Sequence, residues 1–133
     1  MNIVVDSSVL VAALVDSGPH GDWAEEVLAG GSLQAPELIR AEATNIFRRL
    51  ERAKLITTPE ANAAQGDLMQ LDIELFPFEP FASRVWELRH NVTSYDAWYV
   101  AIAEALKLPL ATLDGPLSIS SGVGCKFLTP ALL

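Results

Sequence analysis

Short apolar runs alternate with longer segments of helical periodicity along this chain. The runs are brief and rich in β-branched or aliphatic residues, as buried strands are, and they occupy residues 2–6, 33–35, 73–78, 110–113 and 125–128. Helices are predicted between them, over residues 9–15, 20–29, 37–54, 58–71, 79–90 and 96–107. No hairpin signal joins any two strands, so the pattern predicts βαβ crossovers, a parallel sheet and a three-layer α/β fold.

Polar residues and glycines mark the predicted ends of these elements. Ser7-Ser8 are expected to cap the first helix, Thr58 the fourth and Thr93-Ser94 the last. Residues 115–124 are rich in Ser and Gly and are predicted to form a mobile surface loop. Trp98 and Tyr99 lie on a helix that is apolar almost all round, which indicates core positions.

Length and composition fit one compact domain over residues 1–133. Half of the 133 residues are apolar, but no apolar run approaches the roughly 20 residues of a membrane span, so no membrane partner is expected. No signal peptide is visible, and the single cysteine, Cys125, excludes an internal disulfide. These features suit a cytoplasmic protein.

The formal net charge of −8 argues against a protein that binds nucleic acid over its whole surface. Five of the nine basic residues nevertheless fall within residues 40–54. Arg48, Arg49 and Arg52 form a local basic strip on the predicted third helix, and they are candidates for contact with RNA or with a partner protein. A solvated helix face is the alternative interpretation of the same three residues.

Four carboxylates stand where predicted strands end or helices begin: Asp6, Glu42, Asp96 and Asp114. The carboxyl ends of parallel strands meet at one edge of a sheet, where helix N-termini also gather. A cluster of acids there would be unstable without a positive charge, and a divalent metal is the usual one. His20 and His90 lie outside this group and are expected at the surface, so a carboxylate-held metal is favoured over histidine chemistry.

Each acid also has a structural interpretation. Asp6 suits a helix N-cap, Asp114 precedes Gly in a common turn, and Asp96 completes a Thr93-x-x-Asp96 capping pattern. Glu42 alone could be an exposed acid near a helix start. An α/β binding module whose acids only cap helices therefore stays open as an alternative to a nuclease.

Two other enzyme classes with similar sheets fit less well. A haloacid-dehalogenase-like phosphatase needs Asp-x-Asp after the first strand, and Ser8 occupies the second of these positions. A receiver domain needs paired acids before a phosphorylated Asp and a lysine on a late strand, and this chain has neither arrangement.

Four short fragments in order resemble the PIN-domain ribonucleases, and in particular the VapC toxins of bacterial toxin–antitoxin pairs. They are Val4-Val5-Asp6-Ser7-Ser8-Val9-Leu10, Glu42-Ala43-Thr44-Asn45, Ser94-Tyr95-Asp96-Ala97 and Ala111-Thr112-Leu113-Asp114. The resemblance spans nearly the whole chain. The sequence departs from the family pattern after Asp114, where many relatives have a further acid or a basic residue and this chain has Gly115-Pro116-Leu117.

The resemblance implies a PIN-like α/β/α sandwich with five parallel strands in the order 3-2-1-4-5. It implies that Asp6, Glu42, Asp96 and Asp114 bind Mg²⁺ or Mn²⁺, with Ser7, Asn45 and Thr112 as supporting polar groups. The implied activity is cleavage of structured RNA, such as tRNA or rRNA, to leave a 5′-phosphate and a 3′-hydroxyl. A VapB-type antitoxin and a second copy of the chain are the implied partners; a housekeeping PIN nuclease is the alternative within the family.

Overall fold

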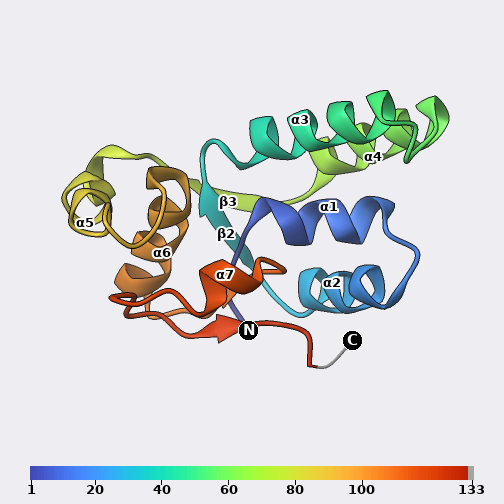
Figure 1. Ribbon diagram of the computed structural model, residues 1–133. Coiled ribbons are helices and arrows are strands. Elements are labelled where there is room, and N and C mark those ends of the chain that lie inside the picture. The colour runs from blue at the N-terminus through green and yellow to red at the C-terminus, as the bar shows by residue number, and fades with distance from the viewer. Residues whose placement is uncertain (132–133) are drawn as a thin grey trace.

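A five-stranded parallel sheet forms the centre of the molecule, with strand order β3-β2-β1-β4-β5 (Figure 1). The computed structural model describes residues 1–131. The strands are β1 (Ile3–Val5), β2 (Leu33–Pro36), β3 (Ile73–Phe76), β4 (Leu110–Ala111) and β5 (Phe127–Leu128). Every neighbouring pair is parallel, so the predicted class and strand order are confirmed.

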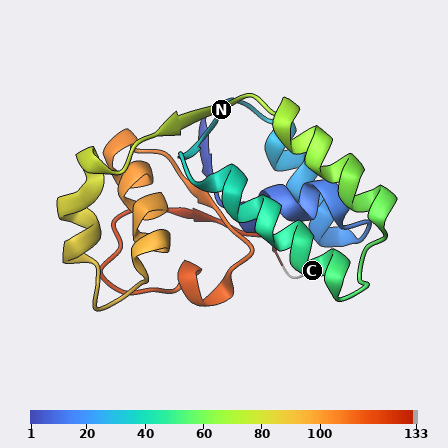
Figure 2. The same ribbon diagram turned by 90° about the horizontal axis from the view of Figure 1, so that it is seen from above.

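Helices cover both faces of the sheet. They are α1 (Ser7–Val15), α2 (Pro19–Ala29), α3 (Ile39–Arg52), α4 (Thr58–Gln70), the 3₁₀ turn η1 (Glu79–Phe81), α5 (Ala82–Glu87), α6 (Ser94–Leu106) and α7 (Gly115–Ser118). Figure 2 shows α1 to α4 on one side of the sheet and α5 and α6 on the other. The three predicted layers are therefore present.

The core is built around the central strand and the two helices that face it. All three residues of β1 are buried, as their uninterrupted apolar run predicts for a strand covered on both faces. On one side Val9 and Leu10 of α1 are fully buried, and on the other Val100 and Ile102 of α6 are fully buried. This packing fixes the start of α1 and the start of α6 against the same end of β1.

The residues that cap the helices differ from the prediction in two places. Asp6 is the N-cap of α1, and its carboxylate accepts from the Val9 amide at 3.2 Å, so Ser7 and Ser8 belong to the first turn. Thr57 caps α4 in a capping box with Glu60, so the prediction of Thr58 was one residue late. Thr93 caps α6 as expected. Adjacent hydroxyl and carboxylate groups are all good caps, and local pattern alone does not choose among them.

Residues 115–124, predicted as a loop throughout, begin with the short helix α7 and are anchored to α5 and α6. Arg84 of α5 holds Glu104 of α6 through two bonds, of 2.7 and 3.0 Å, and also donates to the Gly122 carbonyl at 2.9 Å. Glu104 accepts from the Gly124 amide at 2.6 Å. The two side chains thus tie the segment that follows Asp114 to the helices beside it. None of the helices described within residues 1–131 is both long and apolar enough to cross a membrane.

Candidate active site

Asp6 lies at the carboxyl end of β1, and its carboxylate is fixed from three directions. The Ser8 hydroxyl donates to Oδ1 at 2.5 Å, the Val9 amide donates to the same oxygen, and the Thr112 hydroxyl donates to Oδ2. Thr112 follows β4, the strand next to β1, and is fully buried. An ionised carboxylate has about four acceptor positions, so Asp6 keeps acceptor capacity for one further partner.

Burial works against the charge that these bonds favour. Asp6 is only 6% exposed, and desolvation raises its pKa to about 6; the hydroxyl and amide donors pull the pKa down, and the negative charge of Asp96 pushes it up. The Asp6 carboxylate is therefore held in place by its hydrogen-bond donors, although its burial disfavours the ionised form. A carboxylate in that state is stabilised by any cation that approaches it.

Glu42 reaches the same region from the first turns of α3. The Tyr99 hydroxyl of α6 donates to its Oε1 at 2.5 Å, and Ser7 faces the same hydroxyl. Burial raises the pKa of the half-buried Glu42, the bond from Tyr99 lowers it, and the charge of Asp96 raises it. Burial followed by the bond to Glu42 also raises the pKa of the Tyr99 phenol, so Tyr99 stays a neutral donor at this position.

Asp96 in the first turn of α6 joins the other three acids into one group. It acts on Asp6 and on Glu42 through its charge, and its own pKa is raised by burial first and by the charge of Asp114 second. Asp114 follows β4, caps α7 by accepting from the Leu117 amide at 3.0 Å, and donates its own amide to Thr112 Oγ1 at 2.9 Å. Charge interactions through Asp96 thus link acids from four separate segments near the carboxyl edge of the sheet.

The capping interpretations of Asp6 and Asp114 are also correct, because both carboxylates accept from helix amides. Asp96 differs. Its backbone amide donates to the Thr93 hydroxyl at 3.2 Å, so the main chain makes the capping bond, while burial and the charge of Asp114 raise the pKa of the carboxyl and a side-chain hydrogen bond with Thr93 lowers it. Capping therefore explains why two of the acids stand at helix starts, but not why the charge of Asp96 acts on or is affected by each of the other three.

The donor set fits a hydrated Mg²⁺ or Mn²⁺ better than a closed protein cage. All four groups offer carboxylate oxygens, which are the ligands that these hard cations prefer. Within residues 1–131, no three acidic, histidine or cysteine side chains stand close enough together to enclose an ion by themselves. Mg²⁺ in phosphate-processing sites is typically held by one or two carboxylates, several waters and the substrate, which matches this looser arrangement.

The basic strip lies farther along α3 than Glu42. Arg48, Arg49 and Arg52 are all exposed, and Arg48 Nη1 lies 3.5 Å from the Asn45 side-chain oxygen. Asn45 is exposed and lies one turn beyond Glu42 on α3. Its side-chain hydrogen bond is to Arg48, and among the described residues it makes none to the four acids. Arg40 is different from the strip, because its guanidinium donates to the Leu71 carbonyl at 2.6 Å and ties α3 to the end of α4.

Three residues of this region were not predicted as part of it. Ser8 bonds Asp6 and accepts from the Leu113 amide at 3.1 Å, so it links the ends of β1 and β4. Tyr99 is 3% exposed, as predicted for a core residue, yet its hydroxyl serves Glu42. His90 is exposed, as predicted, but it lines a groove of about 470 Å³ together with Asp96 and Asp114. Of these three residues, only Tyr99 could have been inferred from the sequence, because a tyrosine predicted in the core needs a hydrogen-bond partner for its hydroxyl.

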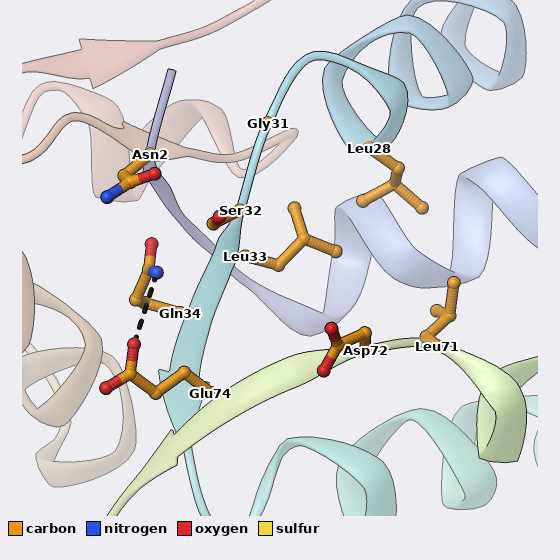
Figure 3. Close-up of a pocket in the computed structure, with 9 residues that line it drawn as sticks. All are labelled: Asn2, Leu28, Gly31, Ser32, Leu33, Gln34, Leu71, Asp72 and Glu74. Atoms are coloured by element: carbon orange, nitrogen blue, oxygen red, sulfur yellow. Dashed lines mark hydrogen bonds between the residues drawn. The ribbon is translucent and has the colours of Figure 1, made fainter.

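The largest cavity described lies at the opposite edge of the sheet (Figure 3). It measures about 690 Å³ and is lined by Asn2, Leu28, Gly31, Ser32, Leu33, Gln34, Leu71, Asp72 and Glu74. Figure 3 shows Gln34 between Asn2 and Glu74, with its amide nitrogen 3.5 Å from a Glu74 oxygen. None of the four acids lines this cavity, so it is separate from the candidate site.

Taken together, the parallel sheet and the acids at its carboxyl edge define a small α/β protein with an acidic site suited to divalent cations. A family model described as the PIN domain matches residues 3–118. The chain is 37% identical to Ribonuclease VapC1 of Mycobacterium tuberculosis over 124 residues, which cover 92% of this chain and 93% of the relative. The chain therefore belongs to the PIN-domain family and, within it, to the VapC group.

Solved structures agree with this assignment at the level of the fold. VapC20 of Mycobacterium tuberculosis, described as a toxin that cleaves the sarcin–ricin loop, superposes with a TM-score of 0.66 at 18% identity and covers 92% of this chain and 96% of its own. VapBC2 of Rickettsia felis, solved bound to a DNA fragment from its promoter, gives a TM-score of 0.66 at 13% identity over 98% of this chain and 100% of the matched one. Both similarities concern the fold alone.

Proposed function

We propose that this chain is a metal-dependent endoribonuclease and the toxin of a VapBC-type pair. The observation that carries the proposal is the position of Asp96, whose charge acts on Asp6 and Glu42 and is itself acted on by Asp114. Relatives with 37% identity over nearly the whole chain are named ribonucleases, which supports RNA as the substrate class. Repulsion between Asp96 and each of the other three acids, which lie on otherwise unrelated segments, favours a cation site over four independent helix caps.

Asp6 and Asp96 are proposed to hold the principal ion, while Glu42 and Asp114 complete the site directly or through water. When bound, Mg²⁺ or Mn²⁺ supplies charge neutralisation at the phosphoryl oxygens and lowers the pKa of a bound water. Thr112 and Ser8 keep both oxygens of Asp6 in position, and Tyr99 does the same for one oxygen of Glu42. Glu42 or Asp114 then orients the attacking water, and the expected products carry a 5′-phosphate and a 3′-hydroxyl.

Arg48, Arg49 and Arg52 are proposed to hold the RNA backbone beside this site, with Ser7 and Asn45 as supporting polar groups. Seven residues of helix separate Glu42 from Arg49, which is about 10 Å at ~1.5 Å per residue. That span is a little over one phosphate spacing, so the strip can hold the backbone while the acids act on a neighbouring phosphodiester. Unpaired loops of structured RNA, as in tRNA or rRNA, are the expected targets because their splayed bases allow recognition by shape.

Cleavage of an RNA panel tests this function. The purified chain is incubated with tRNA, rRNA and single-stranded DNA in buffer with Mg²⁺ or Mn²⁺, and the products are separated on a denaturing gel. We expect defined cuts in at least one RNA, their loss on addition of EDTA, and their return when Mg²⁺ or Mn²⁺ is restored in excess. Cleavage that persists unchanged in EDTA would contradict a carboxylate-held metal, and an intact panel under all conditions would contradict the nuclease.

We propose a binding place for the expected antitoxin. An apolar groove of about 480 Å³ runs between α1 and the end of α3, and Ser8, which bonds Asp6, lies in its wall. Leu55 at its rim is 73% exposed, and Ile46 and Leu50 also line it. Within residues 1–131 both recorded salt bridges involve Arg84, so the four acids have no cationic partner there. A partner that fills the groove with an apolar segment can place a basic side chain among the acids.

A small protein encoded beside this gene, with a DNA-binding N-terminus, is the expected partner. Co-expression should give a stable complex in which RNA cleavage is suppressed, and Leu55→Glu should weaken it by about tenfold or more, as loss of a buried apolar anchor does. Met69→Glu, at an exposed apolar residue of α4 outside the groove, is the matched control. Affinity is measured by titration calorimetry, and equal weakening by both variants would reject the groove as the antitoxin's binding site.

A homodimer is the other expected assembly of this chain. Light scattering on the chain alone should then give twice its 14.4 kDa mass.

A further inference from the structure

An exposed tryptophan stands on α5, on the far side of α6 from the basic strip (Figure 2). Trp86 is 67% exposed, while its neighbours Val85 and Leu88 are 3% and 1% exposed and supply the packing of this segment. The indole is therefore not needed to fill the core. Tryptophan is enriched among the side chains that anchor binding surfaces.

Arg89 lies over the ring of this tryptophan. Its guanidinium carbon lies 4.3 Å from the centroid of the Trp86 ring, and Nη1 donates to the Trp86 carbonyl at 2.8 Å. The two contacts hold the guanidinium over the ring, so the pair presents an aromatic ring and a positive charge side by side. As a contact within the protein, a cation–π pair at an exposed site contributes little to stability, which gives no structural need for so open a tryptophan.

Arg89 of the pair lines the groove that also contains two of the acids. His90, Asn91 and Thr93 line the same 470 Å³ groove, and so do Asp96 and Asp114. Pro116 and Leu117 of α7 line it too, and their segment is anchored by Arg84 and Glu104. The groove thus connects the arginine of the stacked pair with two of the four acids.

Charge also favours RNA on this path. The acids repel a phosphodiester, so a substrate needs cations on each side of the site to stay in place. The arginines of α3 supply them on one side only. Arg89 makes no salt bridge among the described residues, and its charge is therefore available to a phosphate on the other side.

We infer that the Trp86–Arg89 pair and the groove beside it form a nucleotide-binding subsite, in which an unpaired base stacks on the pair and Arg89 holds the adjoining phosphate. The inference rests on the proposed ribonuclease function and adds the residues that grip the RNA on the α5 side. Bases stack on aromatic rings and on guanidinium planes in many single-stranded RNA complexes, and replacing such a ring by alanine weakens the binding. Such a subsite would also favour unpaired nucleotides over a closed duplex.

Binding can be tested apart from cleavage. Fluorescence anisotropy measures the affinity of Asp6→Asn protein for a short labelled single-stranded RNA of mixed sequence, so cutting does not disturb the titration. Trp86→Ala and Arg89→Ala in that background should each weaken binding by about tenfold, while Trp86→Phe should retain most of the affinity. Lys126→Ala, which removes an exposed charge before β5, and Met69→Ala, which removes an exposed apolar side chain of α4, are the matched controls.

A second arm locates the stacked base. Single abasic nucleotides are introduced at successive positions of the RNA, and one position should weaken binding to the parent protein but have little further effect on the Trp86→Ala variant. That non-additivity shows that the base and the indole are energetically coupled, as a stacked pair is. Thermal melting of each variant verifies that it is folded, which is expected because the Trp86 and Arg89 side chains are exposed.

The results separate this inference from the function on which it rests. Unchanged RNA affinity in Trp86→Ala and Arg89→Ala, in a chain that still cleaves RNA, would overturn the subsite and leave the nuclease standing. Unchanged RNA affinity together with weakened binding of the antitoxin would overturn it by assigning the pair to a protein contact. Weakening of equal size by Lys126→Ala would overturn it too, because it would show only a dependence on overall charge.

Discussion

Asp6→Asn is expected to reduce RNA cleavage by at least about 100-fold while leaving the fold intact. The substitution removes the negative charge that the proposed ion needs and keeps a side-chain oxygen of the same reach. Asn is as good an N-cap as Asp, so the bond from the Val9 amide that begins α1 can be kept. Loss of activity without loss of structure would therefore separate catalysis from helix capping.

Initial cleavage rates at saturating Mg²⁺ measure the effect, with circular dichroism as the check on folding. Asp72→Asn is the matched control, because it removes the same charge from the cavity at the opposite edge of the sheet. The control should cleave like the parent chain. Retention of most activity by Asp6→Asn would instead favour the binding module, in which the acid serves the helix alone.

Asp96→Asn is expected to raise the melting temperature of the metal-free protein at pH 7.5 by a few degrees, on the order of 1 kcal/mol of unfolding free energy. Burial first and Asp114 second raise the pKa of Asp96, so the folded protein disfavours its charge. Removing that charge also relieves Asp6 and Glu42, whose pKa values Asp96 raises. The capping bond to Thr93 comes from the main chain and is kept.

The same shifts set the sign of the pH dependence. Groups whose folded pKa is raised bind protons more tightly in the folded state, so their stabilising effect is present at low pH and lost as pH rises. The pKa of Asp6 is raised from 3.8 to about 6, and those of Glu42 and Asp96 are also raised. In EDTA the parent chain should therefore gain stability as pH falls from 7.5 to 5, and Asp96→Asn should gain less.

Differential scanning calorimetry in EDTA and then in Mg²⁺ measures both effects. Asp22→Asn is the control, because Asp22 lies in the first turn of α2 as Asp96 does in α6, but is exposed. It should lower stability by a few tenths of a kcal/mol through the lost interaction with the helix end. Mg²⁺ should stabilise the parent chain more than Asp96→Asn. A lower melting temperature for Asp96→Asn in EDTA would mean that the negative charge of Asp96 stabilises the folded state, which would contradict repulsion among the acids.

The sequence is sufficient to predict the sheet and the segments that carry the acids. Short β-branched runs such as Ile3–Val5, separated by helical periodicities, leave few arrangements other than a parallel sheet, and the carboxyl ends of its strands then share an edge. Family resemblance supplied the strand order. The acids could be placed at this edge because each follows a strand or begins a helix, which is a local property.

Contacts between distant segments could not be predicted in the same way. Ser8 was predicted as a cap, but it bonds Asp6 and the Leu113 amide, which requires the end of β4 to lie beside the start of α1. The bond from Tyr99 to Glu42 joins positions 57 residues apart. Segment 115–124 has the composition of a free loop, yet the pairing of Arg84 with Glu104 anchors it. Side-chain hydrogen bonds of this kind depend on packing, which composition and periodicity do not specify.

The most direct measurement is the position of bound Mn²⁺, found from its anomalous scattering in crystals of this chain grown with MnCl₂. The proposal predicts a peak roughly 2 Å from a carboxylate oxygen of Asp6 or Asp96, with Glu42 and Asp114 turned toward the ion or its waters. A peak at some other place, or saturating Mn²⁺ with these four carboxylates unligated, would contradict the metal site on which the proposed function rests.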